Sequence, residues 1–216
     1  DFDQVFSAAL RYSSARGLFA YAARHGHGVR SVDLVAAYLQ GKFLDGEVVY
    51  CHMPPGYVEY AADGQPRVAR IEKPIYGIQQ AGRRLQRRLF DWLKAQCFVP
   101  LDDSDHCVFN LPTSDGEDLK IGVYVDNLQI VHSVKLDSDG NGPAGSAYAS
   151  FMTNLARDWE VVDEGPMEDL LGIQVERNAE QRLAQVEGII LILPLSMITG
   201  WHFLCQPATR GNRSYS

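Results

Sequence analysis

Two apolar runs around a short polar centre constrain the fold of this chain more than any other feature. The polar centre is Asp126-Asn127, and apolar residues alternate before it and after it: Ile121, Val123, Val125, Leu128 and Ile130. Such a pattern around two polar residues is typical of a tight β-hairpin. The sequence therefore predicts two antiparallel strands within residues 119–131, with the polar residues held out at their tip.

Hydrophobic spacing and turn residues predict the remaining elements. Helical spacing occurs at residues 12–26, 80–98 and 147–159. Short strands are expected at 29–33, 47–52, 107–111 and 170–176, a turn with a short helix at 36–44, and a flexible loop at 133–146. Because strands and helices do not alternate as βαβ units, the predicted class is α+β, an antiparallel sheet with helices packed on one face.

Composition excludes several classes of protein. The chain has 216 residues, 46% of them hydrophobic, and a net charge of −7, which excludes collagen, coiled coil and wholesale disorder. Its four cysteines lie far apart without CxxC spacing, which favours a reducing intracellular setting, cytoplasmic or nuclear, and no zinc site. No signal peptide is visible, and we expect the chain, which starts at Asp1, to be cut from a longer protein.

No contact with a membrane is predicted. The only candidate segment, residues 189–205, is shorter than the roughly 20 apolar residues that a spanning helix needs. It is also interrupted by a proline, a glycine and polar residues, so a buried strand or an unstructured tail is expected instead.

Charge is distributed unevenly along the chain. Between Arg67 and Lys94, eight cationic and two acidic residues give a local charge of +6, which leaves −13 for the rest. Local sign, more than net charge, decides what a surface attracts. This segment therefore predicts either a surface for a polyanion or the solvated face of an amphipathic helix.

Two aspartates are candidates for a metal site. Asp33 ends the strand predicted at 29–33, and Asp126 lies at the hairpin tip, so an antiparallel sheet can bring them together. Hard Mg²⁺ prefers oxygen ligands and usually keeps waters and substrate phosphates, as phosphoryl transfer requires. The alternative is that Asp33 is an ordinary turn residue.

Several motifs together resemble copia-type retrotransposon reverse transcriptases. They follow in the family's order: VDLVAAYLQG (32–41), EVVYCHMPPGY (47–57), IYGIQQAGRR (75–84), SDHCVFN (104–110), VYVDNLQIV (123–131) and MEDLLGIQV (167–175). The resemblance covers residues 1–176, which we assign to a partial reverse transcriptase palm-like domain. Residues 177–216 are assigned to a divergent, poorly ordered C-terminal tail.

The resemblance implies an RNA-directed DNA polymerase with two magnesium ions. It gives catalytic positions to Asp33, Asp126 and Asn127, and the two aspartates would bind the metals. Tyr38 stands where the family places an aromatic that blocks a nucleotide's 2′-hydroxyl, although its spacing fits a core aromatic equally well. The implied partners are an RNA or DNA template with its primer, and deoxynucleoside triphosphates.

Contacts to the template or nucleotide are implied for glutamines and arginines around the start of the longest helix. These residues are Gln79, Gln80, Arg83, Arg84, Arg87 and Arg88. Glutamine amides offer donors and acceptors, and arginines can follow phosphates with a binding strength that depends on salt.

Three departures from the family predict impaired activity. The family's hairpin tip is Tyr-Val-Asp-Asp, and Asn127 replaces its last carboxylate, which removes a negative charge beside divalent ions. Its Pro-Arg-Ala-Trp stretch is Gly-Arg-Arg-Leu at residues 82–85, and its finger segment would lie before Asp1, so the fingers are truncated. The alternative function is a catalytically inactive palm remnant that binds only nucleic acid or a protein. A nucleotide cyclase is disfavoured because no glycine-rich GGDEF-like turn precedes a paired acidic site.

Overall fold

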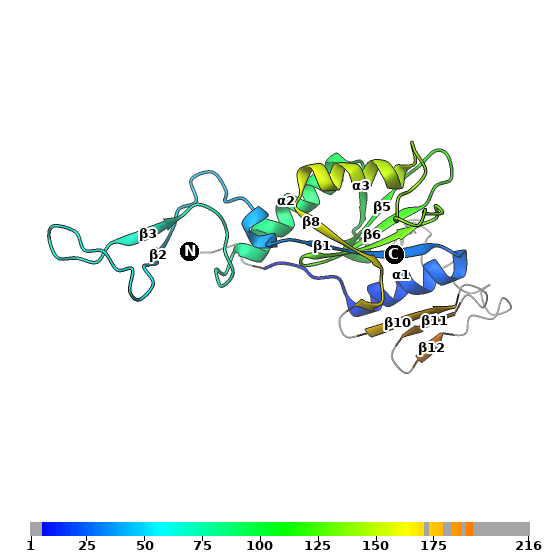
Figure 1. The fold of residues 1–216 in the computed structure, drawn as a ribbon, viewed down its shortest axis with the longest axis horizontal. Helices are drawn as coiled ribbons and strands as arrows, with labels where there is room; N and C mark the ends of the chain where they lie inside the picture. The colour runs from blue at the N-terminus through cyan, green and yellow to red at the C-terminus, as the bar shows by residue number, and fades with distance from the viewer. Residues whose placement is uncertain (1–5, 171–172, 179–182, 187–188, 192–216) are drawn as a thin grey trace, which may run out of the picture.

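A six-stranded antiparallel sheet forms the centre of the computed structural model, which describes residues 6–170, 173–178, 183–186 and 189–191. The strand order is β4-β5-β6-β7-β1-β8, and Figure 1 shows the sheet with the helices packed around it. The strands are β1 (Gly28–Leu34), β4 (Val99–Leu101), β5 (Asp105–Leu111), β6 (Leu119–Tyr124), β7 (Asn127–His132) and β8 (Val161–Pro166). The α+β class, the antiparallel sheet and the hairpin at residues 119–131 are confirmed.

Helices cover both faces of this sheet, and not one face as predicted. The helices that pack on it are α1 (Tyr12–His25), α2 (Ala81–Ala95) and α3 (Ala147–Asp158). Gly122 in β6 faces α1, where an added Cβ would come within 2.9 Å of Leu18 Cδ1. Its neighbour Ile121 points to the opposite face and pairs with Phe109, whose ring meets Phe90 of α2 at 4.9 Å.

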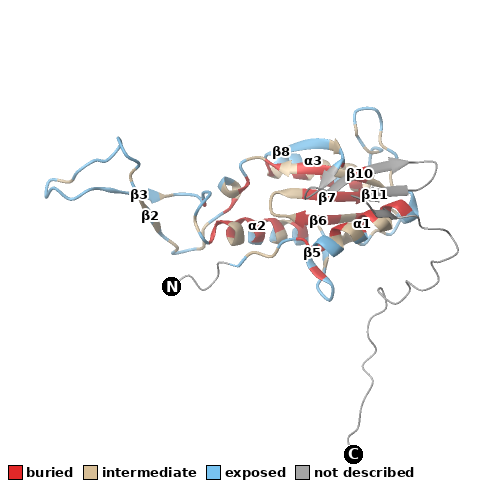
Figure 2. Cartoon of the chain, turned by 90° about the horizontal axis from the view of Figure 1, so that it is seen from below, coloured by how far each residue is buried: buried red, intermediate tan, exposed pale blue. Residues whose placement is uncertain are grey.

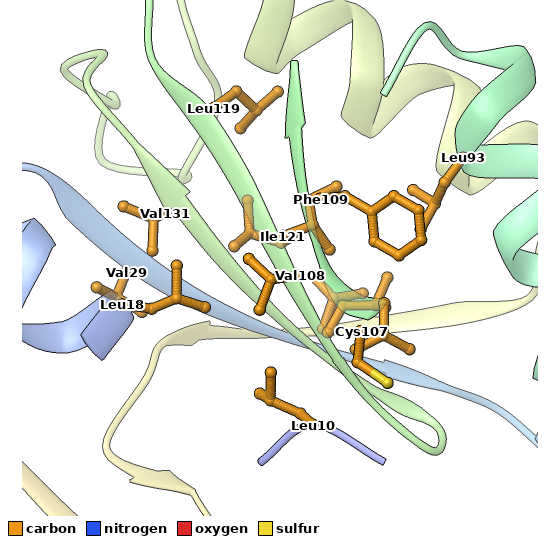
Figure 3. Packing of buried hydrophobic residues seen from close by; sticks show 14 of the residues in the cluster. Leu10, Leu18, Val29, Leu93, Cys107, Val108, Phe109, Leu119, Ile121 and Val131 are labelled. Atoms are coloured by element: carbon orange, nitrogen blue, oxygen red, sulfur yellow. The ribbon is translucent and has the colours of Figure 1, made fainter. Parts of the chain in front are cut away.

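The physical reason for this two-sided cover is the composition of the central strands. Five of the six residues of β7 are buried, and four of the six of β6. A strand that is apolar on both sides needs an apolar layer on each, whereas a half-solvated strand would alternate with polar residues. The buried residues accordingly follow the middle strands and the inner helix faces (Figure 2), and Figure 3 shows side chains of this core.

Aromatic side chains join α2 and α3 to each other over the second face. The Phe151 ring of α3 lies 5.8 Å from Trp92 of α2 and 5.2 Å from Phe98 just beyond α2. Aromatic pairs at such distances add to the stabilisation from buried area. This packing fixes the position of α2 against the sheet, and with it the part of the basic segment that α2 carries.

A two-stranded arm projects from the sheet between the short 3₁₀ helix η1 (Ala37–Gln40) and α2. It consists of β2 (Val49–His52) and β3 (Val68–Ile71), and Figures 1 and 2 show it extending well away from the main body. The strand predicted at 47–52 is thus present. Strands β3, β4 and β8 have no counterpart among the strands predicted from the sequence.

A second, four-stranded sheet has the order β12-β11-β10-β9. Its strands are β9 (Asp169–Leu170), β10 (Ile173–Asn178), β11 (Leu183–Val186) and β12 (Ile189–Leu191). Residues 192–216 lie outside the described residues, so the expected tail and its boundary at residue 176 stay predictions. In the described part of the chain, no helix is long and apolar enough to cross a membrane.

Candidate active site

The β6–β7 hairpin places its turn one residue earlier than the polar centre in the sequence. Tyr124 pairs with Asn127, so the two turn residues are Val125 and Asp126, and Asn127 is the first residue of β7. Val125 has a φ of +54°, as the first central residue of a II′ hairpin turn does. The reason is register, because pairing of Val32 with Leu128 keeps the apolar side chains of both strands in the core.

Asp33 lies beside this hairpin tip. It pairs with Asn127 across β1 and β7, and the next residue, Leu34, donates its amide to the Asp126 carbonyl at 2.8 Å. Strand order therefore brings together two aspartates that are more than 90 residues apart in the sequence. Asp33, Asp126 and Asn127 are all half-buried.

The electrostatics of the tip favour a cation. Burial raises the pKa of Asp33, and the negative charges of Asp126 and Glu164 raise it further. Like charges held close together disfavour ionisation, and a bound cation relieves the repulsion. The tip therefore combines carboxylates with an unbalanced negative charge.

Helix α1 crosses the sheet face in the direction away from the hairpin tip. Gln129 donates to the carbonyl of Ala15 in the first turns of α1, at 3.4 Å. Further along, Tyr21 donates to Asp118, just before the other end of β6. The helix therefore runs away from the hairpin tip.

Tyr38 lies close to the candidate site, as its predicted role requires. It belongs to η1, is half-buried, and its ring centroid lies 5.5 Å from that of Tyr76. Burial is the main cause that raises the pKa of Tyr38, and the negative charge of Asp126 and the nearby Tyr76 raise it further. The structure thus brings Tyr38 within the electrostatic reach of the hairpin tip.

The two predicted glutamines have different surroundings. Gln79 is exposed, whereas Gln80 at the start of α2 is 2% exposed. The Gln80 side chain helps to lower the pKa of the Glu47 carboxyl, although its Nε2 has no hydrogen-bond partner among the described residues. Gln79 is free to meet a ligand, and Gln80 belongs to the interior around Glu47.

The four predicted arginines also separate into two pairs. Arg84 is buried and bonds to Glu47 through two nitrogens, at 2.8 and 3.1 Å. Arg88 bonds to the Gln40 carbonyl and lies 4.2 Å above the Trp159 ring, and burial lowers its pKa. Both therefore hold α2 against its neighbours.

Arg83 and Arg87 differ from that pair, because their side-chain contacts among the described residues stay within α2. Arg83 is half-buried and donates to Gln86 at 3.1 Å, whereas Arg87 is exposed and lies 3.9 Å from Asp91. Of the four arginines that the sequence placed on the basic face of α2, these two therefore keep the fewest contacts with the rest of the protein. Contact of any of the four with nucleic acid stays a prediction.

Sequence reasoning missed Ser31 and Glu164, which lie next to Asn127. Ser31 donates to Glu164 Oε2 at 2.6 Å, and Asn127 Nδ2 donates to Ser31 Oγ at 3.0 Å. The available signal was the Asp-Glu-Gly-Pro stretch at residues 163–166, since an acidic pair followed by glycine is typical of an irregular strand.

The donor chemistry of the tip fits magnesium. Asn127 Oδ1 is buried and has no protein partner among the described residues. This amide oxygen and the two carboxylates are oxygen donors of the kind that this ion prefers. The described residues contain no group of three histidine, cysteine or acidic side chains already arranged around one metal position. A metal would therefore depend on the two aspartates, the amide oxygen and donors from water or substrate.

The six-stranded antiparallel sheet with its three helices is an α+β fold of the palm-like class. The model of the family described as reverse transcriptase (RNA-dependent DNA polymerase) matches residues 1–207, and the chain belongs to this family. No solved structure gives a significant match.

Curated relatives are retrovirus-related Pol polyproteins of plant transposons. The chain is 26% identical over 182 residues to that of TNT 1-94 from Nicotiana tabacum, covering 84% of the chain and 13% of the relative. It is 28% identical over 177 residues to that of RE1 from Arabidopsis thaliana, covering 82% and 11%. The chain therefore spans only a small part of the length of these relatives.

Proposed function

We propose that this chain is the palm-containing part of an RNA-directed DNA polymerase of copia type. The observation that carries the proposal is the pairing of Asp33 with the β6–β7 hairpin, which sets its carboxyl-bearing strand end beside Asp126 in a chain of the reverse transcriptase family. The reaction would be nucleotidyl transfer from a deoxynucleoside triphosphate to the 3′-hydroxyl of a primer on an RNA or DNA template.

The residues at and near the tip would have separate roles in this reaction. Asp33 and Asp126 would hold two magnesium ions, which when bound supply charge neutralisation and lower the pKa of a bound hydroxyl. Tyr38, near Asp126, would restrict the space beside the nucleotide sugar, where a 2′-hydroxyl distinguishes RNA from DNA precursors. Asn127 contributes only a neutral oxygen.

The neutral Asn127 lowers the expected rate. A missing unit charge about 4 Å from a cation corresponds to several kcal/mol even at an effective dielectric of about 20. Because about 1.4 kcal/mol corresponds to a factor of ten, the rate is expected to be reduced by orders of magnitude relative to a tip with two aspartates.

Magnesium-dependent primer extension tests the proposal. We expect the chain to extend a DNA primer on an RNA template, and Asp33→Asn to lower the rate about 100-fold or more, because it removes a metal-holding charge. The matched control is Asp103→Asn, an exposed aspartate beyond β4, which should leave the rate unchanged.

Two results would overturn the proposal. One is incorporation by Asp33→Asn at the rate of the unmodified chain. The other is binding of template and primer without incorporation at any magnesium concentration, which would leave the chain as a binding module.

A further inference from the structure

Glu164 reaches the candidate site through an irregularity in β8. The β1–β8 register shifts between Ser31, which pairs with Gly165, and Val32, which pairs with Asp163, so Glu164 is the extra residue of a β-bulge. Bulges redirect side chains locally. Asp163 bonds to Arg30 on one side of the strand pair, whereas Glu164 accepts a hydrogen bond from the Ser31 hydroxyl on the other.

The hydrogen bonds from Asn127 to Glu164 have a fixed direction. An ionised carboxylate only accepts, so the Ser31 hydroxyl proton points to Glu164 Oε2, at 2.6 Å. The Ser31 oxygen then accepts from Asn127 Nδ2 at 3.0 Å, and the same nitrogen lies 3.5 Å from Glu164 Oε2. A flipped amide would place Oδ1 against an oxygen without a free proton and against a carboxylate.

This direction determines which atom of Asn127 remains available. With Nδ2 engaged, Oδ1 is the open atom, and it is buried without a partner among the described residues. An amide oxygen is a hard donor that suits magnesium, whereas an amide nitrogen is not. The open atom is therefore the one that the proposed reaction can use.

We propose that Ser31 and Glu164 are positioning residues that hold the Asn127 amide in one orientation, with Oδ1 turned to the proposed active site. The geometry of this inference comes from the hydrogen bonds of Ser31. Its consequence for catalysis rests on the proposed function. Neither residue needs to touch metal or substrate.

The orientation can be measured without any catalysis, by nuclear magnetic resonance of the Asn127 side-chain amide protons. We expect these protons to exchange with water at least tenfold more slowly than those of exposed asparagines, and Ser31→Ala to abolish the protection. Ser31→Thr keeps the hydroxyl and should restore it. The control, Asp163→Asn, alters the same bulge on its Arg30 side and should leave the Asn127 signals unchanged.

A double-mutant comparison tests the consequence for magnesium. Ser31→Ala should raise the magnesium concentration needed for half-maximal primer extension about tenfold. With Asn127→Asp as the background, the same change should raise it less than twofold, because a carboxylate has two equivalent oxygens and no orientation to lose.

The outcomes separate this inference from the proposed function. Loss of amide protection in Ser31→Ala supports the positioning role even if no variant incorporates nucleotides, in which case only the proposed function fails. Unchanged protection in Ser31→Ala, or equal magnesium shifts in both backgrounds, would overturn the inference even if primer extension is robust.

Discussion

Glu47 and Arg84 form an ion pair that is largely withdrawn from water, with 16% and 8% of their side chains exposed. Burial by itself would raise the pKa of Glu47, but hydrogen bonds from Arg84 and from the Leu44 amide outweigh it and hold that pKa below its usual value. The pair therefore stabilises the fold above the carboxyl's unfolded pKa. This contribution is lost as the pH falls through the lower, folded pKa.

Removing one partner of this pair should be costly. Arg84→Met leaves the Glu47 carboxylate buried and unpaired, so we expect the free energy of unfolding to fall by about 3 kcal/mol or more in urea titrations at neutral pH. Adding Glu47→Leu should recover part of the loss. Arg87→Met, an exposed neighbour on α2, serves as the control and should change stability by less than about 0.5 kcal/mol. Equal effects of Arg84→Met and Arg87→Met would contradict the assigned role of Arg84.

At the scale of elements, α3 has its first amides satisfied by two side chains from different parts of the chain. Ser146 accepts from the Ala149 amide at 3.1 Å as a local N-cap. The Glu117 carboxylate, in the segment before β6, accepts from the amides of Ala147 and Tyr148, both at 2.8 Å. A negative charge here also interacts favourably with the helix dipole. These contacts fix the start of α3 to the sheet.

Loss of either cap should therefore destabilise the protein measurably. We expect Ser146→Ala to cost about 1 kcal/mol. Glu117→Ala should cost about 2 kcal/mol, because it removes two hydrogen bonds to a charged acceptor. Urea unfolding followed by circular dichroism gives both values, and Ser150→Ala on the exposed face of α3 is the control. If all three variants were equally stable, the caps would not anchor α3.

For the whole molecule, the local charge of a segment and the packing of its side chains together determine how many cations a bound nucleic acid can reach. Residues 67–94 carry +6 within a chain of net charge −7. Packing engages Arg84 and Arg88 with other parts of the protein, which leaves Arg83, Arg87 and the exposed Lys94 as the cations of α2 without such contacts. A nucleic acid on this face would therefore meet fewer cations than the sequence offers.

The salt dependence of template-primer binding tests this division. The plot of log affinity against log salt should become less steep by about 0.9 for each phosphate contact that is lost, hence by up to about 2 in the double variant Arg83→Gln with Arg87→Gln. The exposed Arg157 of α3 provides the control, Arg157→Gln, for which the slope should not change. An unchanged slope in the double variant would make Arg83 and Arg87 a solvated face only.

The sequence by itself determined the class of fold and the ends of the main elements, because these follow from local patterns. The spacing of apolar residues predicted helices at residues 12–26, 80–98 and 147–159, and the structure has them at 12–25, 81–95 and 147–158. Ordered motifs likewise predicted the family that the comparison then gave. Each of these signals is a local pattern or an ordered series of local motifs.

Only the tertiary structure decided which side chains face one another. The arginines of α2 are alike in sequence, yet contacts with Glu47, Gln40 and Trp159 draw two of them inside. The neighbours of Asn127 come from β1 and from a bulge in β8, more than 30 residues away. Strand order, register and burial set these contacts, and they depend on the whole chain packing at once.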